Sequence, residues 1–95
     1  MIINIEVSPK KDRRYRVYML DGSHMDIGNV NRLDEYIDTG DKKARANYYH
    51  SLDAVERREF LKLKASRVVI EACLLNGAST NIIKNINYLN EILAD

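Results

Sequence analysis

A chain of 95 residues has room for one modest hydrophobic core, and it is too short for an active-site cleft between two domains. With 45% hydrophobic and 31% charged residues, its composition is that of a folded globular protein and argues against disorder. The net charge of +1 hides a segregation of sign, because residues 1–20 and 42–67 are rich in Lys and Arg whereas residues 21–41 are rich in acids. Such segregation suits oriented contact with a partner.

Cysteine content and hydropathy indicate the kind of cellular compartment in which the protein is expected. Cys73 is the only cysteine and lies in an apolar run, so we expect a buried structural thiol and a reducing compartment. The start of the chain turns polar too soon for a signal peptide, and no apolar run approaches the roughly 18 residues that a membrane-spanning helix needs. We therefore expect a soluble protein that is not secreted.

The first 28 residues predict a three-stranded antiparallel meander. Ile3, Ile5 and Val7 alternate with polar residues, which is typical of a half-buried strand. After a basic loop, residues 15–28 predict a β-hairpin around Asp21-Gly22, a pair that favours a type I′ turn. With Leu20 opposite Ser23, one face would carry Tyr18, Leu20, Met25 and Ile27, and the other face would carry Val17, Met19, His24 and Asp26.

Residues 31–95 predict helices that cover the apolar face of this sheet. Asn31 and Asp41 are expected to cap two short helices, and Gly40 is expected to end the first of them. Their apolar residues are Leu33, Tyr36 and Ile37 in the first helix, and Ala44, Tyr48 and Tyr49 in the second. The predicted fold class is therefore α+β, a single domain with a meander at residues 1–28 and a helical part at residues 31–95.

A long helix is predicted from Asp53, which with Glu56 resembles a capping box, to the C-cap at Asn76-Gly77. Its first half is amphipathic, with Val55, Phe60 and Leu63 as the apolar residues. Its second half, residues 68–75, is apolar nearly all round, which indicates a central buried helix; the β-branched residues there leave a strand as the alternative.

Ser79 is expected to cap a last helix that forms an antiparallel pair with the preceding one. The apolar stripe of this helix consists of Ile82, Ile83, Ile86, Leu89, Ile92 and Leu93. Such a stripe either closes the core or covers a groove on a partner.

Two motifs contain residues that could carry chemistry. Asp38-Thr39-Gly40 has the form of the retroviral-type aspartic protease triplet, but that fold needs apolar strands on both sides, so a helix end is favoured here. His24 and Asp26 could share a metal ion or a proton, yet two ligands make no complete site and a surface cross-strand pair is favoured. Without a nucleophile triad, phosphate loop or zinc pattern, no catalytic, cofactor or metal residue is assigned.

Two groups of basic residues are the candidate partner-binding sites. The first, at residues 10–16 and interleaved with Tyr15, has the composition to bind phosphates and stack a base. The second lies in the predicted helix at residues 54–67, near Lys42, Lys43 and Arg45. The candidates are Lys10, Lys11, Arg13, Arg14, Tyr15, Arg16, Arg57, Arg58, Lys62 and Lys64. A pI of 7.8 and the acidic block at residues 21–41 count against a dedicated nucleic-acid domain.

A series of short motifs runs through residues 10–90. Basic residues and Tyr15 lead to Asp21-Gly22 and Ile27-Gly28, and a charged stretch at residues 41–43 precedes Tyr48-Tyr49-His50. Ser66-Arg67 opens the apolar segment that ends in Leu74-Leu75-Asn76-Gly77, and Ile86 and Tyr88 follow it. This order resembles a family of small uncharacterised proteins encoded by large nucleocytoplasmic double-stranded DNA viruses. The resemblance implies a viral origin and a small protein packaged in or on the virion.

The expected function is that of a non-enzymatic structural or interaction protein, a minor virion or capsid-associated component located in the virion or the infected-host cytoplasm. It would bind capsid or core proteins through its basic residues, with exposed apolar positions of the last helix as anchors. The alternative is a small nucleic-acid-binding module that uses residues 10–16 and 54–67, and an enzyme stands third. Homo-oligomerisation stays open.

Overall fold

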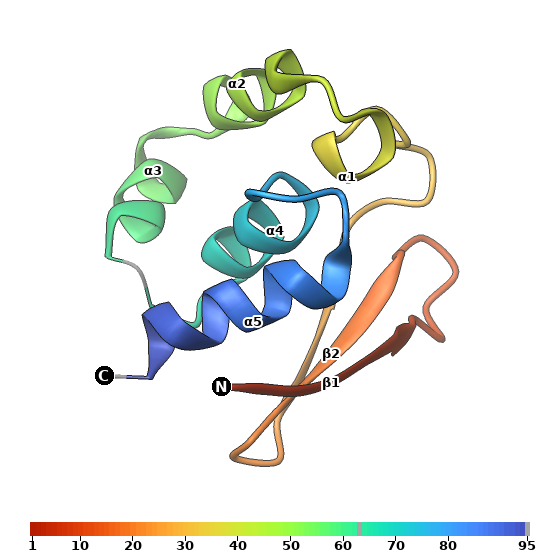
Figure 1. Cartoon of the computed structure of the whole chain (residues 1–95), viewed down its shortest axis with the longest axis vertical. Coiled ribbons are helices and arrows are strands. Elements are labelled where there is room, and N and C mark those ends of the chain that lie inside the picture. The colour runs from red at the N-terminus through yellow and green to blue at the C-terminus, as the bar shows by residue number, and fades with distance from the viewer. Residues whose placement is uncertain (63, 95) are drawn as a thin grey trace.

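The computed structural model describes residues 1–62 and 64–94, and it places a three-stranded antiparallel sheet beside a layer of helices (Figure 1). The sheet has the order β1-β2-β3, with β1 at Ile2–Val7, β2 at Tyr15–Met19 and β3 at His24–Ile27. The helices are α1 (Tyr36–Thr39), α2 (Lys42–Ser51), α3 (Ala54–Leu61), α4 (Arg67–Leu75) and α5 (Ile82–Leu93). The predicted α+β class, a meander followed by helices, is confirmed.

The hairpin of β2 and β3 pairs one residue out of the predicted register. Val17 lies opposite Met25, because the loop contains Leu20, Asp21 and Gly22 instead of two residues. The Met19 N–H donates to the Ser23 carbonyl (2.8 Å), and the Gly22 N–H donates to the Met19 carbonyl (3.1 Å). Gly22, at φ 89°, takes the left-handed position that closes such a three-residue loop.

This register decides which residues enter the core. Val17 and Met19 share the buried face with Ile27, so the predicted placement of Tyr18 and Leu20 on that face was wrong. Leu20 is 68% exposed. A slip of one residue moves every side chain of a strand to the other face, which is the physical reason for the error.

Strand β1 is only partly covered. A bulge between Ile2 and Asn4 changes the alternation, so that Ile2 is buried whereas Ile3 is 59% exposed. Val7 is 78% exposed at the far end of the strand, and Ile5 is half-buried. The predicted buried stripe was therefore wrong for Ile3 and Val7.

The caps of the first two helices follow the sequence in part. Gly40, at φ 65°, ends α1, and the Asp41 carboxylate accepts from the Lys43 N–H (2.9 Å) at the start of α2, both as predicted. Asn31 caps no helix, because its N–H donates to the Asn29 side chain in a turn (2.8 Å). Glu35 is the N-cap of α1 instead, so Leu33 stays outside the helix and exposed.

The long helix predicted from Asp53 to Asn76 is two helices. Asp53 and Glu56 form the predicted capping box at the start of α3, with bonds of 2.8 and 3.1 Å. A second N-cap, Ser66, accepts from the Val69 N–H (3.4 Å) and starts α4 in a new direction. Leu63 lies outside the described residues. The break lets α4 enter the core while α3 remains outside it.

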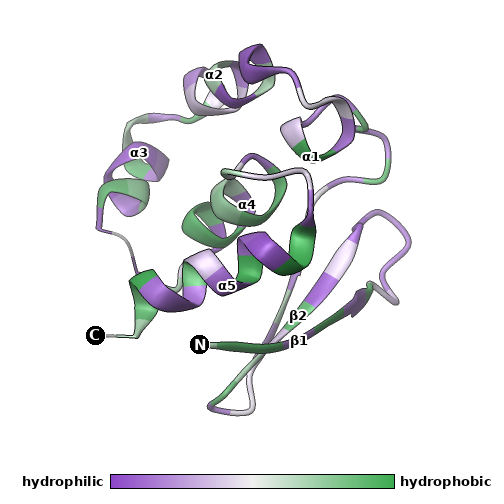
Figure 2. Ribbon diagram, in the orientation of Figure 1, coloured by the Kyte–Doolittle hydropathy of each residue, from purple (hydrophilic) through white to green (hydrophobic). Residues whose placement is uncertain are grey.

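Helix α4 is the centre of the molecule, as predicted. In Figure 1, α1, α2 and α3 form an arc around it, and Figure 2 shows that it is mostly hydrophobic. Its buried residues Val69, Ile70 and Leu74 form one cluster with Val17 and Ile27 of the sheet. Burial of α4 on several sides is the main apolar contribution to the core.

Helix α5 closes the core with only part of its predicted stripe. Asn81, not Ser79, is its N-cap and accepts from the Ile83 and Lys84 N–H groups. Ile86 and Leu89 are buried, whereas Ile83 and Ile92 are exposed. The buried Asn85 turns towards the α4–α5 loop, because its side chain satisfies backbone groups there.

Candidate functional site

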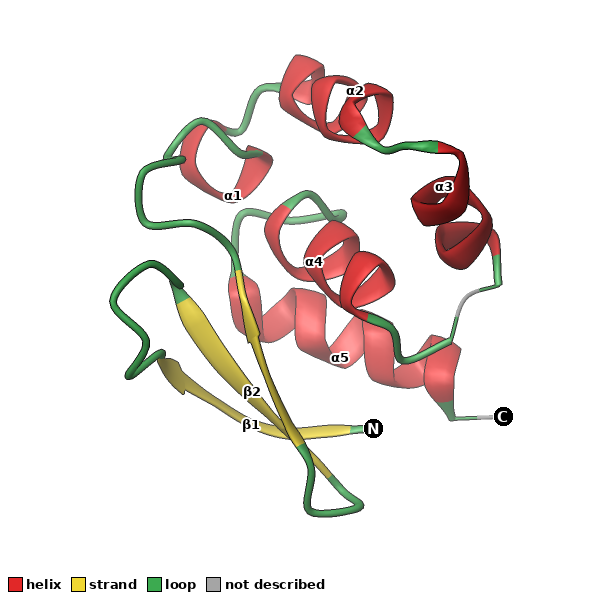
Figure 3. Cartoon of the chain, turned by 180° about the vertical axis from the view of Figure 1, so that it is seen from behind, coloured by secondary structure: helices red, strands yellow, loops and turns green. Residues whose placement is uncertain are grey.

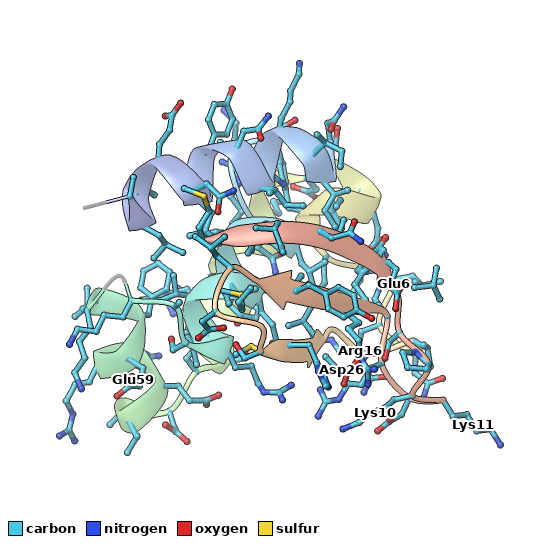
Figure 4. All side chains as sticks on the ribbon, turned by 90° about the horizontal axis from the view of Figure 1, so that it is seen from below. Glu6, Lys10, Lys11, Arg16, Asp26 and Glu59 are labelled. Atoms are coloured by element: carbon cyan, nitrogen blue, oxygen red, sulfur yellow. The ribbon has the colours of Figure 1, made fainter. Side chains whose placement is uncertain are left out.

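The two arginines at the centre of the basic loop are held by carboxylates of the same molecule. Arg14 donates to both oxygens of Asp38 at 2.8 and 2.9 Å. Arg16 donates to both oxygens of Asp26 at 3.0 and 3.1 Å, and Figure 4 shows the two side chains pointing toward one another. Such two-pronged pairs fix the guanidinium groups in place. Two cations that the sequence offered to a partner therefore stabilise the fold.

Asp26 of β3 interacts with several polar side chains near the basic loop. It also accepts from the Ser8 hydroxyl (2.6 Å), and the Lys10 ammonium lies 3.7 Å away. Hydrogen bonds from Arg16 and Ser8 hold the pKa of Asp26 far below its usual range. His24 lies on the same face, as predicted, but its ring faces Tyr18 at a centroid distance of 6.1 Å.

The remaining candidates of the loop divide between the interior and solvent. Tyr15 is half-buried and packs against the core, so its ring is not presented for base stacking. Arg13 donates to the Gly28 carbonyl at 3.4 Å. Lys10 and Lys11 are exposed, and Figure 4 shows Lys11 extending away from the sheet.

The second basic group lies on and just after α3. Lys62 pairs with Glu59 at 3.0 Å, whereas Arg58 and Lys64 are exposed. Arg57 stacks on the ring of Tyr49 at 5.3 Å. In Figure 4, Glu59 of α3 and the loop with Lys10 and Lys11 lie at opposite ends of the molecule. The structure therefore does not bring the two basic groups together.

The break before α4 opens a pocket that the sequence had not indicated. Its volume is about 440 Å³, and it lies between α2, α3 and the last turn of α4. Tyr48, Tyr49 and Phe60 form its aromatic walls, with Cys73 and Gly77 on the α4 side. The rings of Tyr49 and Phe60 meet edge to face at 5.8 Å, so α2 and α3 hold each other in position.

A smaller hollow continues this apolar surface across α4. It has a volume of about 120 Å³, shares Cys73 and Gly77 with the first pocket, and reaches Tyr88 and Ile92 on α5. Both of these α5 side chains are roughly half exposed. We call the two hollows together the apolar groove; its side chains are Tyr48, Tyr49, Phe60, Cys73, Tyr88 and Ile92.

Two arginines beside the groove have no acidic partner among the residues that the structure describes. The Arg45 guanidinium stacks on Tyr36 at 3.8 Å, and its buried Nε has no hydrogen-bond partner. The buried Nε of Arg57 is likewise without a partner. Within residues 1–62 and 64–94, neither side chain forms an ion pair. The rim of the groove on α2 and α3 therefore carries positive charge that the fold does not neutralise.

One sequence signal could have located the groove. Tyr48 and Tyr49 are adjacent in a short helix, and neighbouring helical residues point about 100° apart. Tyr48 packs inward, where burial raises its pKa, and its hydroxyl donates to the Val68 carbonyl. Tyr49 is then left at the surface. The contribution of Phe60 could not be foreseen, because it depends on where α3 folds.

Burial perturbs several ionisable groups on and near α4. Burial raises the pKa of the Cys73 thiol, which lowers its thiolate fraction at neutral pH. Burial also raises the pKa of Glu35 and of Glu71. Asp38 of the Asp-Thr-Gly triplet sits in α1 and binds Arg14. In the described part of the chain, no group of three or more His, Cys, Asp or Glu side chains is placed to hold a metal ion.

Among the described residues, none of the helices is both long and apolar enough to cross a membrane. Comparison with known protein families, with curated proteins and with solved structures yields no match to this chain.

Proposed function

We propose that this protein is a non-enzymatic interaction module that binds an amphipathic, acidic segment of a partner protein in the apolar groove. The observation that carries the proposal is an open pocket of about 440 Å³ with three aromatic walls, beside two arginines that no described acid neutralises. The motif series resembles that of small proteins of large DNA viruses, so we propose capsid or core components as the first partners to test and a minor virion component as the role of the chain.

The shape of the groove favours a protein segment over a compact small molecule. The two hollows lie on either side of Cys73 and Gly77, so the apolar surface runs from α2 and α3 across α4 to α5. An amphipathic helix or extended segment can place successive apolar side chains along such a surface. Aromatic anchors in a desolvated pocket are also where interfaces concentrate their binding energy.

The positive charge of the groove rim favours a partner segment with negative charge. Lys42 and Lys43 start α2, and Arg45 and Arg57 flank the pocket with stacked guanidinium groups. A stacked arginine that forms no ion pair can donate from its guanidinium group to a carboxylate of the partner without losing an existing ion pair. Acidic residues beside the apolar anchors of a partner would therefore add specificity and speed association.

A random-peptide selection tests the proposal. We expect the wild-type chain to enrich peptides with apolar residues at spacings of three and four and with Asp or Glu between them. Tyr49→Ala should weaken these peptides at least tenfold, because it removes one wall of the pocket, and Arg45→Gln should weaken acidic peptides selectively. Val55→Ala, at an exposed position of α3 outside the pocket, is the matched control. Enrichment of basic peptides, or binding that survives Tyr49→Ala, would contradict the proposal.

A DNA titration tests the alternative of a nucleic-acid-binding module. Phosphates would compete with Asp38 and Asp26 for Arg14 and Arg16, and Tyr15 packs inward. We therefore expect no affinity for duplex or single-stranded DNA at physiological salt. Affinity that falls with salt and is lost in the double variant Lys10→Gln, Lys11→Gln would favour the alternative instead.

A further inference from the structure

The outer edge of β1 is open for part of its length. The Ser8 N–H donates to the Arg14 carbonyl (3.1 Å), and Glu6 lies opposite Arg16 in the same ladder. Because the direction of backbone groups alternates along an antiparallel strand, Ile5 and Val7 present their N–H and C=O groups away from β2. Accordingly, the Ile5 N–H donates to the side chain of its neighbour Asn4 (2.9 Å).

At the Ile2 end of β1, a side chain of α5 makes the two backbone hydrogen bonds that a neighbouring strand would otherwise make. The Ile2 N–H donates to Asn90 Oδ1 (2.8 Å), and Asn90 Nδ2 donates to the Ile2 carbonyl (2.9 Å). Asn90 belongs to α5, which runs beside β1 in Figures 3 and 4. In the described part of the chain, α5 therefore satisfies the edge at Ile2, whereas at Ile5 and Val7 no other helix or strand bonds to it, and the Ile5 N–H reaches only the neighbouring Asn4 side chain.

The open part of the edge is also apolar. Ile3 and Val7 are more than half exposed, and a groove of about 240 Å³ between β1 and α5 is lined by Ile3, Ile5 and Ile83. Exposed edge strands usually carry lysine, proline or inward charges that prevent pairing with another chain. Within β1 the only charged residue is Glu6, whose carboxylate already accepts from the Tyr18 hydroxyl.

We propose that β1 pairs with β1 of a second copy of this chain, antiparallel about a two-fold axis at Ile5. The sequence of β1 is complementary to itself in this register: Ile5 lies opposite Ile5 of the other copy, Val7 opposite Ile3, and Glu6 opposite Asn4. A register centred on Glu6 would place the Glu6 carboxylates of the two copies directly opposite each other, and like charges in that position oppose pairing.

This pairing would join the two sheets into one and would cover the exposed side chain of Ile83 on α5. It uses another face of α5 than the apolar groove, which is lined by Tyr88 and Ile92. Self-association is therefore independent of the proposed partner site, and a dimer would present two such sites.

Sedimentation equilibrium of the full chain under reducing conditions tests the proposal. We expect an average mass that doubles as the concentration rises from micromolar to millimolar. The double variant Ile3→Lys, Val7→Lys should raise the dissociation constant at least tenfold, because charges at both ends of the edge oppose pairing. Leu61→Lys is the matched control: the exposure of Leu61, 69%, lies between those of Ile3 and Val7, but Leu61 belongs to α3, and its variant should dimerise as the wild type does.

A second variant separates edge pairing from general loss of structure. Val7→Pro removes an N–H that points away from β2, so the sheet should persist while pairing is lost; circular dichroism and thermal unfolding check that each variant is folded. A wild type that stays monomeric to millimolar concentration would overturn the proposal, and so would dimers that survive both variants. Binding of an added β1 peptide by a chain that never dimerises would assign the edge to a foreign strand instead.

Discussion

Arg14 and Asp38 form a two-pronged ion pair that ties the start of the β-hairpin to the short helix α1. Both side chains are largely shielded, with 11% and 18% of their surface exposed. The pair spans a segment with little regular structure, residues 28–35, whose position would otherwise depend on a few backbone hydrogen bonds. It therefore holds the helical layer in place over the sheet.

Replacement of Arg14 by Met should lower the free energy of unfolding by about 1–3 kcal/mol, because it leaves the Asp38 carboxylate shielded and unpaired. Arg32→Met is the control. Its ion pair with Asp34 is long, at 3.6 Å, and solvent-exposed, so the change should stay within about 0.5 kcal/mol. Urea unfolding of the three proteins measures both effects. Equal losses in the two variants would contradict the structural role of Arg14.

Asp26 should make stability depend on pH in the acidic range. Its folded pKa lies below the unfolded value of about 3.9, so its ionised form stabilises the folded state above that pH. The contribution is lost as the pH falls toward the folded pKa. The difference in unfolding free energy between wild type and Asp26→Asn should therefore be largest above pH 5 and should shrink toward pH 2. A difference that is constant with pH would show that the charge of Asp26 is not involved.

Glu71 should make stability depend on pH in the opposite direction to Asp26. Burial raises its folded pKa above the unfolded value, so stability falls as the pH rises through the folded pKa. Glu71→Gln removes the charge and keeps an oxygen that can accept from the Gly28 N–H. We expect this variant to be as stable as the wild type, or more stable, at pH 7, with no advantage at pH 4. Thermal unfolding at the two pH values measures the stability of both proteins. A variant that is less stable than the wild type at pH 7 alone would assign a net stabilising role to the ion pair between Glu71 and Arg67.

Asn85 is the buried polar residue that joins α4 to α5. Its amide donates to the Leu74 and Ser79 carbonyls at 3.0 and 2.7 Å, and its oxygen accepts from the Ser79 N–H at 3.0 Å. Asn85→Ala should cost about 2–4 kcal/mol, since it leaves several buried backbone groups without partners. Asn87→Ala, at an exposed position of the same helix, should leave stability nearly unchanged. Chemical unfolding of both variants checks this, and a small loss for Asn85→Ala would mean that water replaces the amide.

Local signals were sufficient for the elements whose stabilising partners lie a few residues away. Gly40 ends α1, and Asp41 starts α2, because a left-handed C-cap and a side-chain N-cap act within one turn. Asp53 and Glu56 start α3 for the same reason. The apolar composition of residues 68–75 predicted the buried central helix, because a helix without a polar face must be covered on most sides.

Contacts between distant residues decided the rest. The hairpin register depends on which apolar residues of β2 and β3 meet α4, and this selected the three-residue loop over the type I′ turn that Asp21-Gly22 favours locally. The break at Ser66 depends on the space that α4 occupies under α2 and α3, and the same break opens the aromatic pocket.

The sequence by itself determined the fold class, the caps at Gly40, Asp41 and Asp53, and the central helix of this protein, because backbone preferences and hydropathy act over short stretches of chain. Only the tertiary structure decided which charges remain available to a partner. The chain places basic and acidic residues in separate segments, but folding brings Arg14 to Asp38 and Arg16 to Asp26, and among residues 1–62 and 64–94 it pairs no acid with Arg45 or Arg57 beside the apolar groove. Charge neutralisation depends on distance in space, which the order of residues along the chain does not specify.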